Sequence, residues 1–184
     1  HETEVEAFID AFDKAVARSY PDGVASRDYA SIISDRHFSR LEALLEDAVS
    51  KGATLRAVGR DAGPGTRIRV FPPTLVIDLT DDMTVMQEEI FGPILPVLSY
   101  RDVSQVIAYI NERPRPLALY VFGQAHGDDC KAILSRTTSG NVGINNTVLH
   151  VAQDDLPFGG VGPSGTGAYH GIEGFRRMSH AKGV

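Results

Sequence analysis

Short β-strand patterns alternate with amphipathic helix patterns through the middle of the chain, and this alternation restricts the possible folds most strongly. Helix patterns follow Asp102 and Asp128, and strand patterns occupy 54–58, 67–71, 75–79, 94–100, 117–122 and 142–144. A strand–helix–strand order favours right-handed crossovers and parallel pairing. The Pro-Pro pair at 72–73 cannot donate to a ladder and predicts a break or a sheet edge. We therefore predict an α/β fold: a largely parallel, three-layer sheet with helices on both faces.

Two further helix patterns precede this section. Apolar residues recur at helical spacing over 5–20, and the Pro-Asp-Gly turn at 21–23 ends that pattern. Ser34 can cap a second helix, which carries an apolar stripe over 38–49 and ends near Gly52. Beyond residue 152 glycines dominate and the periodicity fades, so no regular element is predicted there.

Length and composition restrict the class of protein. The chain has 184 residues and a formal net charge of −6, which fits one acidic globular domain without a basic, nucleic-acid-binding stripe. A single cysteine excludes an internal disulfide and favours a reducing, cytoplasmic location. No apolar run has the length of a membrane span. The chain opens at His1 directly into a helix pattern, which we interpret as a fragment of a longer chain.

An acidic doublet, Glu88-Glu89, precedes an apolar, turn-forming run, Ile-Phe-Gly-Pro at 90–93. Adjacent carboxylates on extended backbone point in opposite directions, so a doublet is not automatically an acid/base pair. The following turn could hold the Glu89 carboxylate toward a cavity. From the residue pattern alone, however, solvent exposure of Glu89 is favoured.

A glycine-rich loop at 159–167 imitates a nucleotide-binding motif. Gly160, Gly162 and Gly165 fit the G-x-G-x-x-G spacing, but a loop rather than a strand precedes them. The dinucleotide fingerprint requires that strand, together with a helix opening inside the glycines. We favour a structural glycine loop over a phosphate site.

Other reactive side chains carry weak patterns. Two acidic residues precede Cys130 and disfavour a nucleophilic thiolate, so we predict an inert helix cysteine. The six histidines lack metal-ligand spacing with Cys, Asp or Glu, and we predict no metal site. His37 is interpreted as a surface residue without a role.

The chain resembles aldehyde dehydrogenases along nearly its whole length. The run E-I-F-G-P at 89–93 matches the family's E-x-F-G-P motif, and P-F-G-G at 157–160, followed by S-G at 164–165, matches a second motif. The segments 117–122 and 140–145 also look like family elements. The tail, with Tyr-His-Gly at 169–171, resembles the dimeric fatty- and aromatic-aldehyde branch, within which bacterial coniferyl aldehyde dehydrogenases are most similar.

This resemblance implies a function. It assigns 1–184 to the catalytic domain, with 166–184 as a tail leading toward the oligomerisation strand. The implied enzyme oxidises an aldehyde to the carboxylic acid with NAD or NADP through a cysteine thiohemiacetal. Glu89 would bind the nicotinamide-ribose hydroxyls, Phe91 would pack beside that ribose, and Phe158 would line the aldehyde tunnel. The implied partners are the chain's own N-terminal dinucleotide-binding domain and a second subunit in a homodimer.

The nucleophile and the general base of that family lie upstream of the matching segment. The resemblance therefore implies that residues 1–184 contain no catalytic residue and that the isolated chain is inactive. Two alternatives stay open. One is an acyl-phosphate or acyl-CoA reductase of the same fold, and the other is a non-catalytic interaction module whose exposed strand pairs with a partner.

Overall fold

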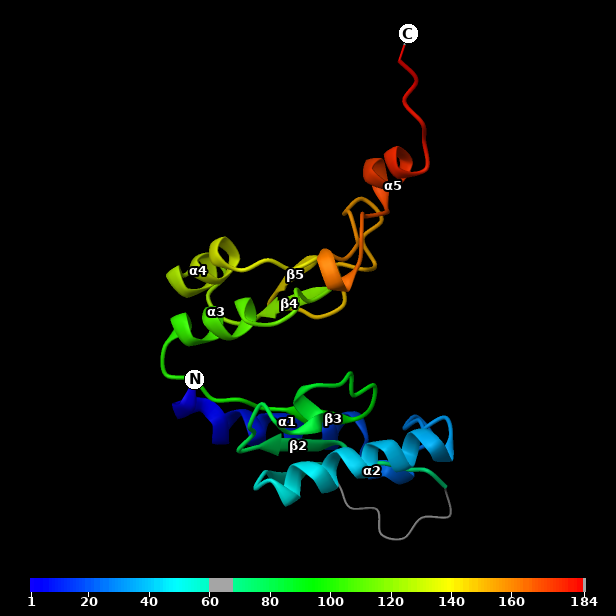
Figure 1. Ribbon diagram of the computed structural model, residues 1–184. Coiled ribbons are helices and arrows are strands. Elements are labelled where there is room, and N and C mark those ends of the chain that lie inside the picture. Colours follow the sequence, from blue (N-terminus) through cyan, green and yellow to red (C-terminus); the bar gives the residue numbers. More distant parts are fainter. Residues whose placement is uncertain (60–67, 184) are drawn as a thin grey trace. The chain divides into compact units, whose positions relative to one another are not determined.

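The computed structural model describes residues 1–59 and 68–183. These residues form two compact units, His1–Ser99 and Tyr100–Val184, each of which is treated by itself (Figure 1). The assignment of 1–184 to one catalytic domain with a tail at 166–184 stays a prediction.

The first unit is a three-stranded sheet with two long helices. Strand β2 is central, antiparallel to β1 and parallel to β3. A 3₁₀ helix, η3, lies in the connection between β2 and β3. The elements are α1 (Val5–Ser19), α2 (Asp35–Ser50), β1 (Thr54–Ala57), β2 (Thr74–Ile77), η3 (Thr84–Met86) and β3 (Ile94–Pro96), with short 3₁₀ helices at Glu2–Glu4 and Gly23–Ala25.

The two helices cover opposite faces of this sheet because neighbouring strand residues point in opposite directions. On β2, Leu75 belongs to a cluster with Ile9 of α1, whereas Val76 belongs to a larger cluster with Leu41 and Leu44 of α2. Leu75, Val76 and Leu41 are all fully buried. The first unit is therefore built in three layers: helix, sheet and helix.

The second unit contains a two-stranded parallel sheet and a glycine-rich carboxyl-terminal part. Helix α4 connects the two strands and lies beside α3 (Figure 1). Asp102 and Gln105 form a capping box that starts α3. The elements are α3 (Val103–Asn111), β4 (Ala118–Val121), α4 (Asp128–Arg136), β5 (Asn141–Ile144), the 3₁₀ helix η4 (Gly162–Ser164) and α5 (Gly171–Arg177).

The predicted α/β class is confirmed, with helices on both faces of the first sheet and parallel pairing in β2–β3 and β4–β5. The pairing of β1 with β2 is antiparallel. A strand over 67–71 was wrong for 68–71, because Arg69 has a φ of 56°, which no strand accepts; Arg67 lies outside the described residues. The strand predicted over 94–100 is shorter, and α5 was missed.

Candidate functional site

The two carboxylates of the acidic doublet have different surroundings. Glu88 lies 3.8 Å from the Arg40 guanidinium, measured from Oε2 to Nη1. The Glu89 side chain is exposed, as the residue pattern alone predicted. Within the part of the chain that the structure describes, the Glu89 carboxylate makes no hydrogen bond or ion pair. Of the two acids, Glu89 is therefore the one that is available to a ligand.

Although the carboxylate of Glu89 is unpartnered, its backbone is held. Arg40 of α2 donates from Nη1 to the Glu89 carbonyl at 3.1 Å and from Nη2 to the Ile90 carbonyl. His37, one turn earlier on α2, makes a 2.7 Å hydrogen bond from Nε2 to the Phe91 carbonyl. Three consecutive carbonyls of the 89–91 segment are thus fixed on the first half of one helix.

The segment then turns sharply at Phe91 and Gly92. Phe91 has a φ of 49°, in the left-handed region that residues with a β-carbon rarely adopt, and its side chain is 80% exposed. Gly92 lies against the buried side chain of Leu41, where an added β-carbon would come within 2.6 Å. Because the turn is packed directly on α2, its direction is set by the helix.

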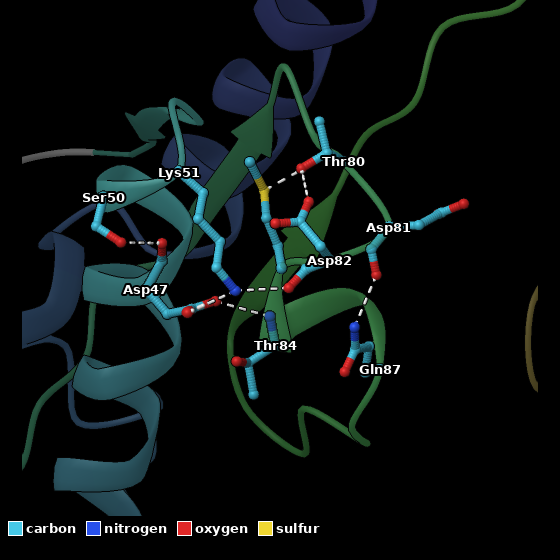
Figure 2. A network of polar contacts seen from close by, with 9 residues as sticks. Asp47, Ser50, Lys51, Thr80, Asp81, Asp82, Thr84 and Gln87 are labelled. Carbon is cyan, nitrogen blue, oxygen red and sulfur yellow. Dashed lines mark hydrogen bonds and ion pairs between the residues drawn. The ribbon is translucent and has the colours of Figure 1, made fainter.

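The approach to Glu89 is anchored on the second half of the same helix, as Figure 2 shows. Asp47 accepts from the Thr84 amide at 2.7 Å and pairs with Lys51 at 2.8 Å. Lys51 in turn donates to the Asp82 carbonyl at 2.5 Å. The hydrogen bond from Lys51, and after it the one from the Thr84 amide, holds the pKa of the Asp47 carboxyl below its usual value. Helix α2 therefore positions the 82–92 segment at both ends.

In the second unit, Phe158 lies half-buried in a cluster of aromatic and imidazole rings. Its backbone pairs with Tyr169 through two hydrogen bonds of 2.8 and 2.9 Å. Its ring lies 5.6 Å from that of Tyr169, 5.7 Å from that of His150 and 6.2 Å from that of His170. The Phe158 ring thus packs among three other rings, on a backbone paired with Tyr169.

The glycine loop after Phe158 packs on its own backbone. A β-carbon on Gly159 would lie 2.0 Å from the Gly167 carbonyl oxygen, and one on Gly160 would lie 2.1 Å from the Ser164 carbonyl oxygen. The Asn141 amide on β5 also donates to the Gly159 carbonyl at 3.1 Å. The glycines serve close backbone approach, which agrees with the predicted structural loop.

Cys130 lies on α4 and is 4% exposed, as expected for an inert helix cysteine. It borders a cavity of about 390 Å³ that is also lined by Tyr100 and Asp128. Across residues 1–59 and 68–183, no group of three or more histidine, cysteine or acidic side chains is arranged to hold a metal ion. None of the helices found in the same residues is long and apolar enough to cross a bilayer.

The sequence-predicted residues fall in both units. Glu89 and Phe91 lie on one segment of the first unit, and Phe158 lies in the second. His37 and Arg40 were missed as side chains that hold this segment; His37, interpreted as a surface residue without a role, makes a hydrogen bond to the Phe91 carbonyl. Their three-residue spacing places them on one helix face, but nothing local indicates carbonyl partners about 50 residues away.

A sequence model described as "Aldehyde dehydrogenase family" matches residues 1–184. A probable coniferyl aldehyde dehydrogenase of Caulobacter vibrioides is 47% identical over 98% of this chain and 38% of its own length. A coniferyl aldehyde dehydrogenase of Pseudomonas sp. strain HR199 is 45% identical over 100% of this chain and 38% of its own length. The solved structure of a substrate-bound Staphylococcus aureus AldH superposes with a TM-score of 0.83, at 36% identity, over 98% of this chain and 38% of that one.

The matches include nearly all of this chain, but the chain spans well under half the length of these relatives. The E-x-F-G-P and P-F-G-G motifs lie in fixed turns, in the order that the resemblance predicted. With a family match over the whole chain and a shared fold, this polypeptide belongs to the aldehyde dehydrogenase family.

Proposed function

We propose that residues 1–184 form part of the catalytic domain of an NAD(P)-dependent enzyme that oxidises an aldehyde to the carboxylic acid. The proposed substrate is an aromatic aldehyde such as coniferyl aldehyde, and a fatty aldehyde is the alternative within the same branch. Identities of 47% and 45% to two relatives whose names specify coniferyl aldehyde support this choice.

The observation that carries the proposal is the contrast between two neighbouring acids. Glu88 is paired with Arg40, whereas the Glu89 carboxylate is exposed on a backbone held by α2. A carboxylate is an acceptor only and can serve two neighbouring hydroxyl groups at once, as on a ribose. The free carboxylate of Glu89 therefore fits the role of binding the nicotinamide-ribose hydroxyls.

Two aromatic side chains, one in each unit, have proposed roles of their own. The exposed ring of Phe91, two residues from Glu89, offers an apolar surface for packing beside the same ribose. Phe158, fixed by its pairing with Tyr169, would line the aldehyde tunnel. The nicotinamide ring, when bound, supplies the hydride acceptor; the residues of this chain orient the cofactor and border the substrate.

Replacing Glu89 in the full-length polypeptide that contains these residues tests the cofactor role. Hydrogen bonds to a charged group are worth about 1.5–3 kcal/mol each, so Glu89→Gln should raise the KM for NAD or NADP by about tenfold or more. Glu88→Gln is the matched control: it removes the neighbouring charge from a surface ion pair worth about 0–1 kcal/mol. Equal cofactor KM values in the two variants would contradict the proposal.

The tunnel role of Phe158 is separable from the cofactor role. Phe158→Ala should raise the KM for coniferyl aldehyde more than that for acetaldehyde, because a large aromatic substrate has more surface to pack against the ring. The KM for the cofactor should stay near that of the parent protein. A change in cofactor KM alone would show that Phe158 does not border the aldehyde.

We further propose that the isolated 184-residue chain does not oxidise aldehydes, since the family resemblance places the nucleophile and general base upstream. The proposed partners are an N-terminal dinucleotide-binding domain of the same polypeptide and a second subunit in a homodimer, in the cytoplasm. Steady NADH production from coniferyl aldehyde by the pure chain would refute the inactivity. Turnover of acyl-CoA but not of aldehyde by the full-length polypeptide would favour the reductase alternative.

A further inference from the structure

Three successive carbonyl groups beside the free Glu89 carboxylate lack partners from regular secondary structure. A strand or helix would satisfy carbonyls through its own ladder, but Glu89, Ile90 and Phe91 lie in neither. Two side chains of α2 replace that ladder: Arg40 for the first two carbonyls and His37 for the third. Because three successive carbonyls are bound, the two side chains restrain the conformation of this turn as well as its location.

The His37 imidazole has a defined tautomer in this arrangement. Arg40 Nε donates to His37 Nδ1 at 3.4 Å, so Nδ1 carries the lone pair and Nε2 carries the hydrogen. Nε2 is then the donor to the Phe91 carbonyl at 2.7 Å. The Ser34 hydroxyl, in turn, accepts from the His37 amide and fixes the start of the helix. The chain of donors runs from Arg40 through His37 to the turn.

All three nitrogen atoms of the Arg40 guanidinium take part in this arrangement. Its Nη1, Nη2 and Nε atoms bind the Glu89 carbonyl, the Ile90 carbonyl and His37, respectively. Its charge lies near Glu88, and no ion pair joins it to Glu89 in the described residues. Arg40 therefore acts on the backbone of Glu89 rather than on its carboxylate.

The backbone at Phe91 requires such support. Residues with a β-carbon at positive φ cost about 1–3 kcal/mol and persist only where the surroundings determine them. The hydrogen bond from His37 to the Phe91 carbonyl and the 6.2 Å edge-on contact between the two rings hold that residue. The side chain of His37 therefore contributes two of the contacts that hold Phe91 in this conformation.

We infer that His37 and Arg40 are positioning residues for cofactor binding: they act on the cofactor only through the turn that presents Glu89 and Phe91. This inference rests on the proposed function of Glu89. It assigns no contact between either residue and the cofactor, and it predicts that most of their effect is lost once the Glu89 carboxylate has been removed.

A double-mutant cycle in the full-length polypeptide tests the inference. Arg40→Met should raise the KM for the nicotinamide cofactor about tenfold to a hundredfold, because small displacements of a binding group are that costly. In a Glu89→Gln background the same substitution should add less than about threefold, since coupled residues are non-additive. Arg40→Lys, with one donor centre instead of a fork, should fall between Arg40→Met and the parent.

The His37 position offers a conservative rescue. The Gln side chain in His37→Gln retains a donor for the Phe91 carbonyl and an acceptor for Arg40, whereas His37→Leu removes both. We expect near-parental cofactor KM in the first and a rise of about tenfold in the second. Arg36→Met, which removes an exposed charge next to His37 on helix α2, is the matched control and should leave the cofactor KM unchanged.

The outcomes distinguish the cofactor role of Glu89 from the positioning role of His37 and Arg40. If Glu89→Gln leaves cofactor binding unchanged, the proposed function is wrong and this inference falls with it. If Glu89→Gln weakens binding but Arg40→Met and His37→Leu do not, only the positioning role is overturned. Full additivity of Arg40→Met with Glu89→Gln would also overturn it. The positioning role is supported if Arg40→Met lowers the thermal midpoint in both the parent and the Glu89→Gln background but raises the cofactor KM substantially only in the parent.

Discussion

A β-carbon added at Gly92 would lie 2.6 Å from Cδ2 and 2.7 Å from Cδ1 of Leu41. Leu41 has 0% exposure, so it cannot move aside easily. Gly92→Ala should therefore destabilise the first unit by about 1–3 kcal/mol, the usual cost of overpacking, and push the turn off α2. Urea unfolding measures the first effect, and the cofactor KM of the full-length polypeptide measures the second.

A second substitution at the same contact makes this prediction specific. Leu41→Ala alone should cost about 2–5 kcal/mol because it leaves a cavity in the core. In the double variant, the methyl group at residue 92 occupies part of that cavity, so the combined cost should be smaller than the sum. Gly183→Ala, with no atom within 4 Å of its added β-carbon, is the neutral control. Strict additivity would show that the collision is relieved elsewhere.

Acid should weaken the anchor between α2 and the 82–84 segment. The pKa of Asp47 is lowered from its ordinary 3.8, chiefly by Lys51 and then by the Thr84 amide. A carboxyl with a depressed folded-state pKa stabilises the fold above its unfolded pKa, and this contribution is lost as pH falls through the folded pKa. The thermal midpoint of Asp47→Asn should lie below that of the parent at pH 7.

The difference between the two proteins should shrink steadily as pH falls below about 4, where the parent carboxyl also becomes protonated. Asp10→Asn, an exposed change on α1, is the control and should follow the parent at every pH. A constant difference between pH 7 and pH 2 would mean that the amide geometry, rather than the charge, causes the loss.

The sequence predicted the elements whose signals are local. Both long helices, the Ser34 cap and the turn at 21–23 follow from apolar spacing and from side chains that serve backbone groups a few residues away. The left-handed glycine at Gly52, which ends α2, belongs to the same class. The E-x-F-G-P motif also indicated Glu89 as a candidate site residue, although only through resemblance to a family.

What the sequence did not predict depends on distant partners. Arg69 and Ile32 make two hydrogen bonds with each other. The Ile32 amide donates to the Arg69 carbonyl, and the Arg69 side chain donates to the Ile32 carbonyl; this pairing replaces the predicted strand. The carbonyls at 89–91 meet α2 across about 50 positions of sequence. Periodicity reports which face of an element is buried, but it does not report which loop packs on that face.

Alkaline conditions should reveal the packing between Tyr29 and the segment before β2. Tyr29 donates to the Phe71 carbonyl at 2.6 Å, and burial, with a smaller effect of Tyr20, raises the pKa of Tyr29 to about 12. Its contribution is present below the ordinary value near 10 and is lost as pH rises toward the folded value. Tyr29→Phe should lower stability at pH 8 and flatten its decline between pH 10 and pH 12.

Tyrosinate absorbance provides an independent measurement of the same group. One tyrosine of the parent should ionise late, and that late step should be missing in Tyr29→Phe. Tyr100→Phe in the second unit is a control variant whose late step should be retained. If the late step persists in Tyr29→Phe, another tyrosine is responsible and the assignment is wrong.

The amide of Asn141 should be essential to the loop that carries Phe158. Its Nδ2 donates to the Leu117 carbonyl at 3.0 Å and to the Gly159 carbonyl at 3.1 Å. An oxygen in place of this Nδ2 would face two carbonyl oxygens and could not donate to either. Asn141→Ala should cost about 1–2 kcal/mol for the two lost hydrogen bonds, and Asn141→Asp should cost more because a carboxylate is repelled by both oxygens. Lowering the pH below about 4 protonates the new carboxyl, which can then donate once, so Asn141→Asp should recover relative to Asn141→Ala. Chemical denaturation of both variants at pH 7 and pH 3 measures this crossover, and an Asn141→Asp protein as stable as the parent at pH 7 would show that the loop is held without the amide.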